Sequence, residues 1–264
     1  MYSRKFALET PDTPAFIMAS TGETVTHREY DERANRLAHL LRAAGLQRGD
    51  HYALFMENNN RFLEVCAAGE RAGLYYTPVN SYLKADELAY IVQNSESQIL
   101  ITSRSRREVA MEAAAMCPRL KLCLIVDGTG DDGNFLDYAT EVAKFPSTPI
   151  EDESLGVSMM YSSGTTGRPK GAVHTHCGFP VKTAQDMVHA FDVHPGDTMY
   201  WVSDMGWMMG PWEVFGMTLL GGTIVLYDGA LDFPGPGRLW ELVERHRDAI
   251  GRPRPLRVGE ECVE

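Results

Sequence analysis

The sequence has little cysteine, no cysteine pair motif and no long hydrophobic run. Five of its 264 residues are cysteines, and none of them forms a CxxC pair. An odd number of scattered cysteines favours free thiols in a reducing compartment over a disulfide framework. No uncharged apolar stretch reaches about 18 residues, and charges at Arg4, Lys5, Glu9 and Asp12 interrupt the region where a signal peptide needs an apolar core. We therefore predict a cytoplasmic protein without a transmembrane segment.

Positive charge is also scarce. The chain has 25 Lys and Arg against 36 Asp and Glu, a formal net charge of −11. This balance argues against a nucleic-acid partner or an anionic membrane surface, which basic proteins bind more often. Apolar residues make up 44% and charged residues 23%, as in ordinary globular proteins. Any anionic ligand is therefore expected to bind at a local site. The sequence does not indicate the oligomeric state.

Short apolar segments alternate with longer amphipathic ones along the first two thirds of the chain. Such alternation is typical of crossover-connected, largely parallel sheets flanked by helices, so the predicted fold class is α/β. Strands are expected as two short segments within 16–25 and at 51–56, 75–79, 98–102, 120–126 and 157–161. Helices are expected at 60–72, 85–94, 104–116, 135–144 and 239–247.

The first of the long helices carries its own start and stop signals. Thr26 and Glu29 have the spacing of a capping box, in which each side chain bonds a free backbone amide. An apolar face then recurs at helical spacing, and Gly45 is suited to the helix end.

Residues 162–171 (SSGTTGRPKG) form the most informative segment. They combine three glycines, four hydroxyls, a proline and the cations Arg168 and Lys170. Glycines let backbone amides approach an anion closely, and hydroxyls and cations add hydrogen bonds and charge. A flexible surface loop is the alternative, but a buried strand directly before the loop favours binding of a triphosphate. The order of residues differs from the nucleotide-triphosphatase signature G-x-x-x-x-G-K-[ST], and the following residues look extended.

Residues 161–171 (YSSGTTGRPKG) resemble the AMP-binding signature of the adenylate-forming enzymes, which include acyl-CoA synthetases, luciferases and peptide-synthetase adenylation domains. Residues 26–49, 73–83, 202–210, 219–227 and 229–240 are also similar to this family, the later ones to its acetyl-CoA-synthetase-like branch. The resemblance implies the incomplete amino-terminal lobe of an ATP-dependent acid–CoA ligase. Such enzymes convert a carboxylic acid to an acyl-adenylate and then, with coenzyme A, to a thioester, as in fatty acid metabolism.

The resemblance also implies roles for individual residues. Thr166 and Lys170 are expected to act in catalysis, with ATP and Mg²⁺ as cofactors and coenzyme A as co-substrate. Residues expected to surround the β- and γ-phosphates are Ser162, Ser163, Gly164, Thr165, Thr166, Gly167 and Lys170.

Trp207, Met208 and Trp212 are candidates for the walls of the acyl pocket, because the equivalent segment lines that pocket in the family. Core packing is the alternative, since aromatic and methionine-rich segments are usually buried. The segment favours a small or medium acid, but the sequence does not identify it.

No metal-binding site is predicted within the chain itself. Residues 127–133 (DGTGDDG) lack the ligand alternation of a calcium loop and are expected to form a solvated turn. His174 and His176 have no further ligands at suitable spacing.

The chain departs from the family near its end. Residues 248–264 have seven Arg, Pro or Gly residues and no strand-like period, although a strand should follow a crossover helix. We therefore interpret residues 1–247 as a partial adenylation domain and 248–264 as an atypical tail outside the ancestral fold. The family's carboxy-terminal domain, with its adenylation lysine, and its Mg²⁺-binding glutamate are missing, so we expect weak or absent activity from the isolated chain. A non-catalytic nucleotide-binding remnant is the alternative, while an unrelated phosphate-binding module or kinase fits the loop poorly.

Overall fold

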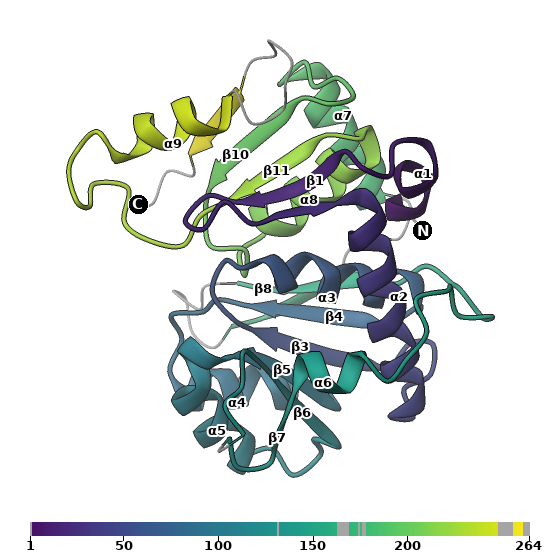
Figure 1. Cartoon of the computed structure of the whole chain (residues 1–264). Coiled ribbons are helices and arrows are strands. Elements are labelled where there is room, and N and C mark those ends of the chain that lie inside the picture. The colour runs from purple at the N-terminus through teal and green to yellow at the C-terminus, as the bar shows by residue number, and fades with distance from the viewer. Residues whose placement is uncertain are drawn as a thin grey trace.

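The protein has two β-sheets with helices between and around them (Figure 1). The computed structural model describes residues 2–130, 132–162, 169–173, 175, 178–247 and 256–260. Among these residues the strands form one sheet of seven and one of five. The predicted α/β class, with largely parallel sheets flanked by helices, is confirmed.

The larger sheet has the strand order β7-β6-β5-β3-β4-β8-β9. All neighbouring strands in it are parallel except the β8–β9 pair, which is antiparallel. Its strands are β3 (His51–Phe55), β4 (Tyr75–Val79), β5 (Ile99–Ser103), β6 (Leu122–Val126), β7 (Phe135–Asp137), β8 (Val157–Tyr161) and β9 (Gly171–Val173). Because the strands are parallel, the segments that follow β3, β4, β5 and β8 meet at one edge of the sheet, where ligands bind in many α/β proteins.

The smaller sheet has the order β12-β10-β11-β1-β2 and is parallel except for the β1–β2 hairpin. Its strands are β1 (Pro14–Met18), β2 (Thr24–Thr26), β10 (Thr198–Val202), β11 (Thr223–Leu226) and β12 (Leu256–Glu260). Helices α1 (Tyr2–Glu9), α7 (Gly178–His189), α8 (Met209–Leu220) and α9 (Arg238–Arg247) pack around it (Figure 1).

The helices of the larger sheet lie on its two faces. Those on the inner face, α2 (His27–Ala43), α3 (Asn60–Arg71) and α6 (Tyr138–Val142), share one apolar core with β1 and α8 of the smaller sheet. Those on the outer face, α4 (Ala85–Asn94) and α5 (Arg107–Ala115), cover a second core. Side chains along β3 alternate between the two cores: Tyr52 and Leu54 face the first core, and Ala53 and Phe55 face the second.

Two sequence-based expectations were wrong in detail. Residues 135–144 were expected to be one helix, but Phe135–Asp137 form the edge strand β7 and only Tyr138–Val142 are helical. Residues 248–264 were expected to lack a strand, but β12 pairs in parallel with β10, from Thr198 opposite Leu256 to Val202 opposite Glu260. The crossover through α9 therefore ends in a strand, as a parallel sheet requires. The assignment of the tail to a region outside the ancestral fold stays a prediction.

The capping box at the start of α2 is confirmed. Glu29 donates its backbone N–H to Thr26 Oγ1 at 3.2 Å, and Thr26 donates its own to Glu29 Oε2 at 2.9 Å. The same contacts lower the pKa of Glu29, chiefly through the backbone of Thr26. Gly45 follows the helix with φ of 89°, a left-handed conformation that glycine adopts without strain.

Replacing Thr26 with alanine should lower the free energy of unfolding by about 1 kcal/mol, because a free amide loses its acceptor. Urea denaturation of the variant would measure the loss. Thr24→Ala is the matched control, since Thr24 is an exposed threonine in the same strand. Equal losses in both variants would contradict a capping role.

In the described part of the chain, no helix combines the length and the apolar character needed to cross a bilayer.

Candidate functional site

The predicted phosphate loop lies between β8 and β9. These two strands form an antiparallel pair in which Tyr161 lies opposite Gly171. The two ends of the loop therefore lie next to each other. Ser162 and Lys170 are described at the two ends of the loop. The other predicted phosphate contacts lie outside the described residues: Ser163, Gly164, Thr165, Thr166 and Gly167.

Ser162 and Lys170 contact each other across the base of this loop. The backbone N–H of Ser162 donates to the carbonyl of Lys170 at 3.1 Å, and the N–H of Lys170 donates to Ser162 Oγ at 3.1 Å. Both residues are exposed. None of the ion pairs between described residues includes Lys170, and β9 itself is exposed along its length. The lysine is therefore accessible to an anion in solvent.

An apolar cavity of about 280 Å³ adjoins the loop ends. Its lining residues include Ser162 and Pro169 from the two loop ends, together with Tyr161, Leu83 and Trp207. The structure thus brings Trp207 next to the loop, although 37 or more residues separate them along the chain. A mostly apolar cavity beside a lysine suits a ligand with an organic part and an anionic part.

The two other predicted acyl-pocket residues lie elsewhere. Met208 is 52% exposed. Trp212 is buried in α8, where its ring lies 5.0 Å from that of Trp201 and 5.5 Å from that of Phe191. Its indole N–H donates to Asp186 Oδ2 at 3.1 Å. These contacts fit the core-packing alternative for Trp212, and the substrate role of all three residues stays a prediction.

The segment that carries Trp207 is held by residues that the sequence did not reveal. Asn58, which follows β3, donates to the carbonyls of Ser203 at 2.8 Å and Tyr227 at 3.0 Å and accepts from the N–H of Met205 at 2.8 Å. Ser81, which follows β4, donates to Asp204 Oδ2 at 2.5 Å. These bonds join the carboxyl ends of the two sheets. They link residues more than 120 positions apart, so no local pattern could predict them.

Asp204 is also held from within its own turn, because the N–H of Gly206 donates to its Oδ1 at 2.8 Å. Burial raises the pKa of Asp204, while the bonds from Ser81 and Gly206 lower it. Because Ser81 and Gly206 both donate to its carboxylate, Asp204 holds the turn that precedes Trp207 in one orientation.

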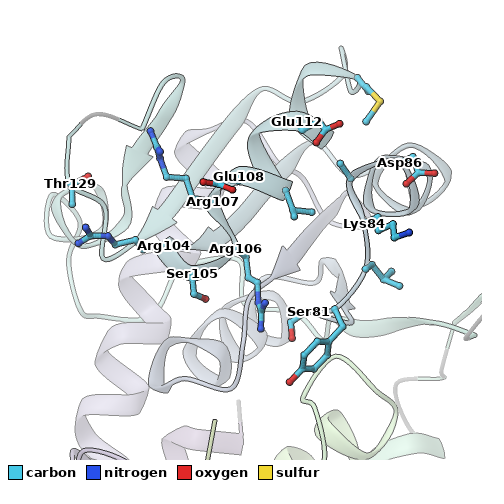
Figure 2. Close-up of a pocket in the computed structure, with 15 residues that line it drawn as sticks. Ser81, Lys84, Asp86, Arg104, Ser105, Arg106, Arg107, Glu108, Glu112 and Thr129 are labelled. Carbon is cyan, nitrogen blue, oxygen red and sulfur yellow. The ribbon is translucent and has the colours of Figure 1, made fainter. Parts of the chain in front are cut away.

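A larger cavity of about 990 Å³ opens between α4 and α5, at the carboxyl ends of β4 and β5 (Figure 2). Four basic residues line it, Lys84, Arg104, Arg106 and Arg107, together with the acidic Asp86, Glu108 and Glu112. The guanidinium of Arg106 lies 5.2 Å from the centroid of the Tyr82 ring. Positive charge is therefore not confined to the predicted loop. The run 104–107 (RSRR), directly after a predicted strand, is a sequence signal that could have indicated this cavity.

The aspartate-rich turn at 127–133 has a structural role in the described residues. Asp132 is buried, accepts from the N–H of Thr129 at 2.7 Å and lies 2.8 Å from Arg107 Nε. It is therefore not a solvated side chain, as expected from the sequence. Within the described part of the chain no cluster of three metal-ligating side chains occurs. His174 and His176 lie outside the described residues.

Comparison with known proteins assigns this chain to a family. A family model described as "AMP-binding enzyme" matches residues 3–249. The human protein named acetyl-coenzyme A synthetase 2-like, mitochondrial, is 30% identical over 273 residues, covering 95% of this chain and 40% of that protein. The acetyl-coenzyme A synthetase of Novosphingobium aromaticivorans is 29% identical over 278 residues, covering 96% of this chain and 42% of that protein.

Among solved structures, acetoacetyl-CoA synthetase from Streptomyces lividans superposes with a TM-score of 0.85 at 28% identity. The match covers 93% of this chain and 40% of that one. The chain thus spans about 40% of the length of these relatives, an amino-terminal portion. Since the family model covers nearly the whole chain and the fold agrees, the protein belongs to the AMP-binding enzyme family.

Proposed function

We propose that the chain is the amino-terminal portion of an ATP-dependent acid–CoA ligase, which activates a carboxylic acid as an acyl-adenylate and then forms a thioester. The observation that carries the proposal is the placement of Lys170 and Ser162 at the base of a signature loop, beside an apolar cavity. Membership of the AMP-binding enzyme family supports the same reaction class.

In the first step of that reaction, a carboxylate oxygen attacks the α-phosphate of ATP and pyrophosphate leaves. Negative charge builds up on the transferring group and on the leaving pyrophosphate, so donors and cations aimed at those oxygens lower the barrier. Lys170 would supply a cation there, and Ser162 and Thr166 would supply hydroxyl donors. Mg²⁺ would offset phosphate charge when bound, with oxygen ligands drawn mainly from the phosphates themselves.

The arginines of the cavity between α4 and α5 support a second polyanionic substrate, although acidic residues also line this cavity. Coenzyme A carries phosphate groups, and Arg104 and Arg106 line a space large enough for a nucleotide-sized ligand. For the acid we propose a small or medium organic group, with Trp207 contacting it in the 280 Å³ cavity. We also propose a cytoplasmic location, which the free thiols of Cys66, Cys117 and Cys123, the cysteines in the described part of the chain, support.

Replacing Lys170 with alanine should weaken binding of Mg-ATP by about tenfold or more, because a charge-assisted hydrogen bond to phosphate is lost. Isothermal calorimetry on the purified chain measures the dissociation constant. Lys121→Ala is the matched control, since Lys121 is an exposed lysine at the amino end of β6, away from the loop. If the wild-type chain does not bind Mg-ATP, or if both variants bind as it does, the proposed site is wrong.

The alternative is a nucleotide-binding remnant without catalytic activity. The chain spans only about 40% of the length of its relatives, which supports this alternative. Acid-dependent ATP–pyrophosphate exchange separates the two functions. We expect weak or absent exchange from a polypeptide of these 264 residues, because it spans only about 40% of the length of its relatives. Robust exchange that is lost in both Lys170→Ala and Thr166→Ala would show instead that the chain is catalytically competent.

A further inference from the structure

The peptide unit between Pro169 and Lys170 is held from two sides. Its carbonyl oxygen accepts a hydrogen bond from the Tyr90 hydroxyl at 3.1 Å. Its N–H, which belongs to Lys170, donates to Ser162 Oγ at 3.1 Å. A peptide unit is planar, so these bonds restrict how it can turn. The Lys170 carbonyl, in the next peptide unit, accepts from the Ser162 N–H at 3.1 Å. The backbone is thus held on both sides of the Lys170 Cα, which restricts the direction in which the side chain leaves it.

Tyr90 is well placed to act as the anchor. It lies on α4 one turn before Asn94, and Asn94 Oδ1 accepts from the Tyr161 hydroxyl at 2.8 Å. Residues four apart share a helix face, so one face of α4 contacts both the end of β8 and the start of the segment leading into β9. Tyr90 is half-buried and lines the same surface depression as Pro169. Its hydroxyl therefore extends from a rigid element to the end of the loop.

The bond from Tyr90 is partly buried, whereas the contacts with Ser162 lie at the surface. The two hydrogen bonds between Ser162 and Lys170 join exposed residues, where water competes for each partner. Proline has no N–H, so the carbonyl is the only backbone hydrogen-bonding group of Pro169. Within the described contacts, the bond from Tyr90 connects this carbonyl to the helical layer.

We propose that Tyr90 is a positioning residue for Lys170, acting through the Pro169–Lys170 peptide unit. This inference rests on the proposed function, in which Lys170 binds the phosphates of ATP. This role requires no contact between Tyr90 and the phosphates, because the Tyr90 hydroxyl bonds the Pro169 carbonyl. It keeps the backbone of Lys170 in the orientation that binding requires. Less conformational entropy is then lost when the ligand binds.

A double-mutant cycle tests the proposal with Mg-ATP and with inorganic tripolyphosphate, which has no adenine or ribose. Tyr90→Phe keeps the ring and removes only the hydroxyl, and should weaken binding of both probes by about fivefold. In a Lys170→Ala background the same change should have no further effect, because the lysine that Tyr90 positions is gone. Tyr75→Phe is the matched control, since Tyr75 lies at the amino end of β4 and stacks on His51.

The outcomes separate this inference from the proposed function. No binding of either probe by the wild-type chain would overturn both. Wild-type binding that Tyr90→Phe leaves unchanged would overturn the inference alone, and so would a loss that adds in full to that of Lys170→Ala. A fivefold loss that disappears in the Lys170→Ala background, with Tyr75→Phe like wild type, supports it.

Discussion

Gly156→Ala is expected to lower the free energy of unfolding by about 3 kcal/mol or more. Gly156 precedes β8 and packs against the carboxyl end of α3. A Cβ at this position would lie 2.0 Å from the carbonyl oxygen of Gly69 and 2.6 Å from that of Leu74. Both oxygens belong to backbone, and the Leu74 carbonyl accepts the N–H of Val157 at 3.0 Å. Neither atom can move away without breaking the contact between α3, β4 and β8.

The same displacement should reach the functional site. β8 carries Tyr161, whose hydroxyl bonds Asn94, and it leads directly into Ser162. We therefore expect the folded Gly156→Ala variant to bind Mg-ATP more weakly than the wild-type chain does. Urea denaturation measures the stability, and calorimetry measures the binding.

Gly235→Ala is the control for this prediction. A Cβ at Gly235 would meet nothing within 4 Å, and its backbone does not have a left-handed φ. The change should alter stability by less than about 0.5 kcal/mol. If Gly156→Ala were as stable as Gly235→Ala, the close packing of β8 on α3 would be wrong.

Glu70→Gln is expected to stabilise the protein at pH 8 by about 3 kcal/mol. Glu70 lies in α3, is buried and accepts a hydrogen bond from the Tyr76 hydroxyl at 2.9 Å. Burial raises the pKa of Glu70 from 4.5 to about 7, while Tyr76 and Arg71 partly offset the increase. A rise of that size corresponds to about 3 kcal/mol.

The sign of the pH dependence follows from where the proton is bound. Between pH 4.5 and pH 7 the folded protein keeps the proton of Glu70 and the unfolded chain releases it. The contribution of this group is therefore fully present below pH 4.5 and is lost as the pH rises to about 7. Glutamine stays neutral at every pH and can still accept from Tyr76, so it removes this loss.

Urea denaturation of wild type and Glu70→Gln at pH 4.5, 6 and 8 checks the prediction. The difference in unfolding free energy should grow with pH across this window. Glu32→Gln, at an exposed position on α2, is the matched control. Parallel pH profiles for wild type and Glu70→Gln would mean that Glu70 is ionised in the folded protein.

Local sequence signals predicted much of the fold. The capping box at Thr26 and the range of α4 follow from neighbouring residues, whose spacing alone sets helix ends and apolar faces. The strand β7 was missed because it has only three residues and runs directly into a helix, and β12 because it is held by pairing with the distant strand β10. β12 contains only five residues and follows a segment rich in arginine and proline, so its own sequence shows no strand period.

The sequence by itself determined the α/β class and the family resemblance and predicted a phosphate loop, because these depend on residue types at short spacing. Only the tertiary structure decided which distant groups meet. It placed Trp207 beside the loop but buried Trp212 against Trp201, and it brought Asn58 to Met205 and Tyr90 to Pro169. Such contacts depend on how crossovers bring strand ends together at one edge, a non-local property of the chain.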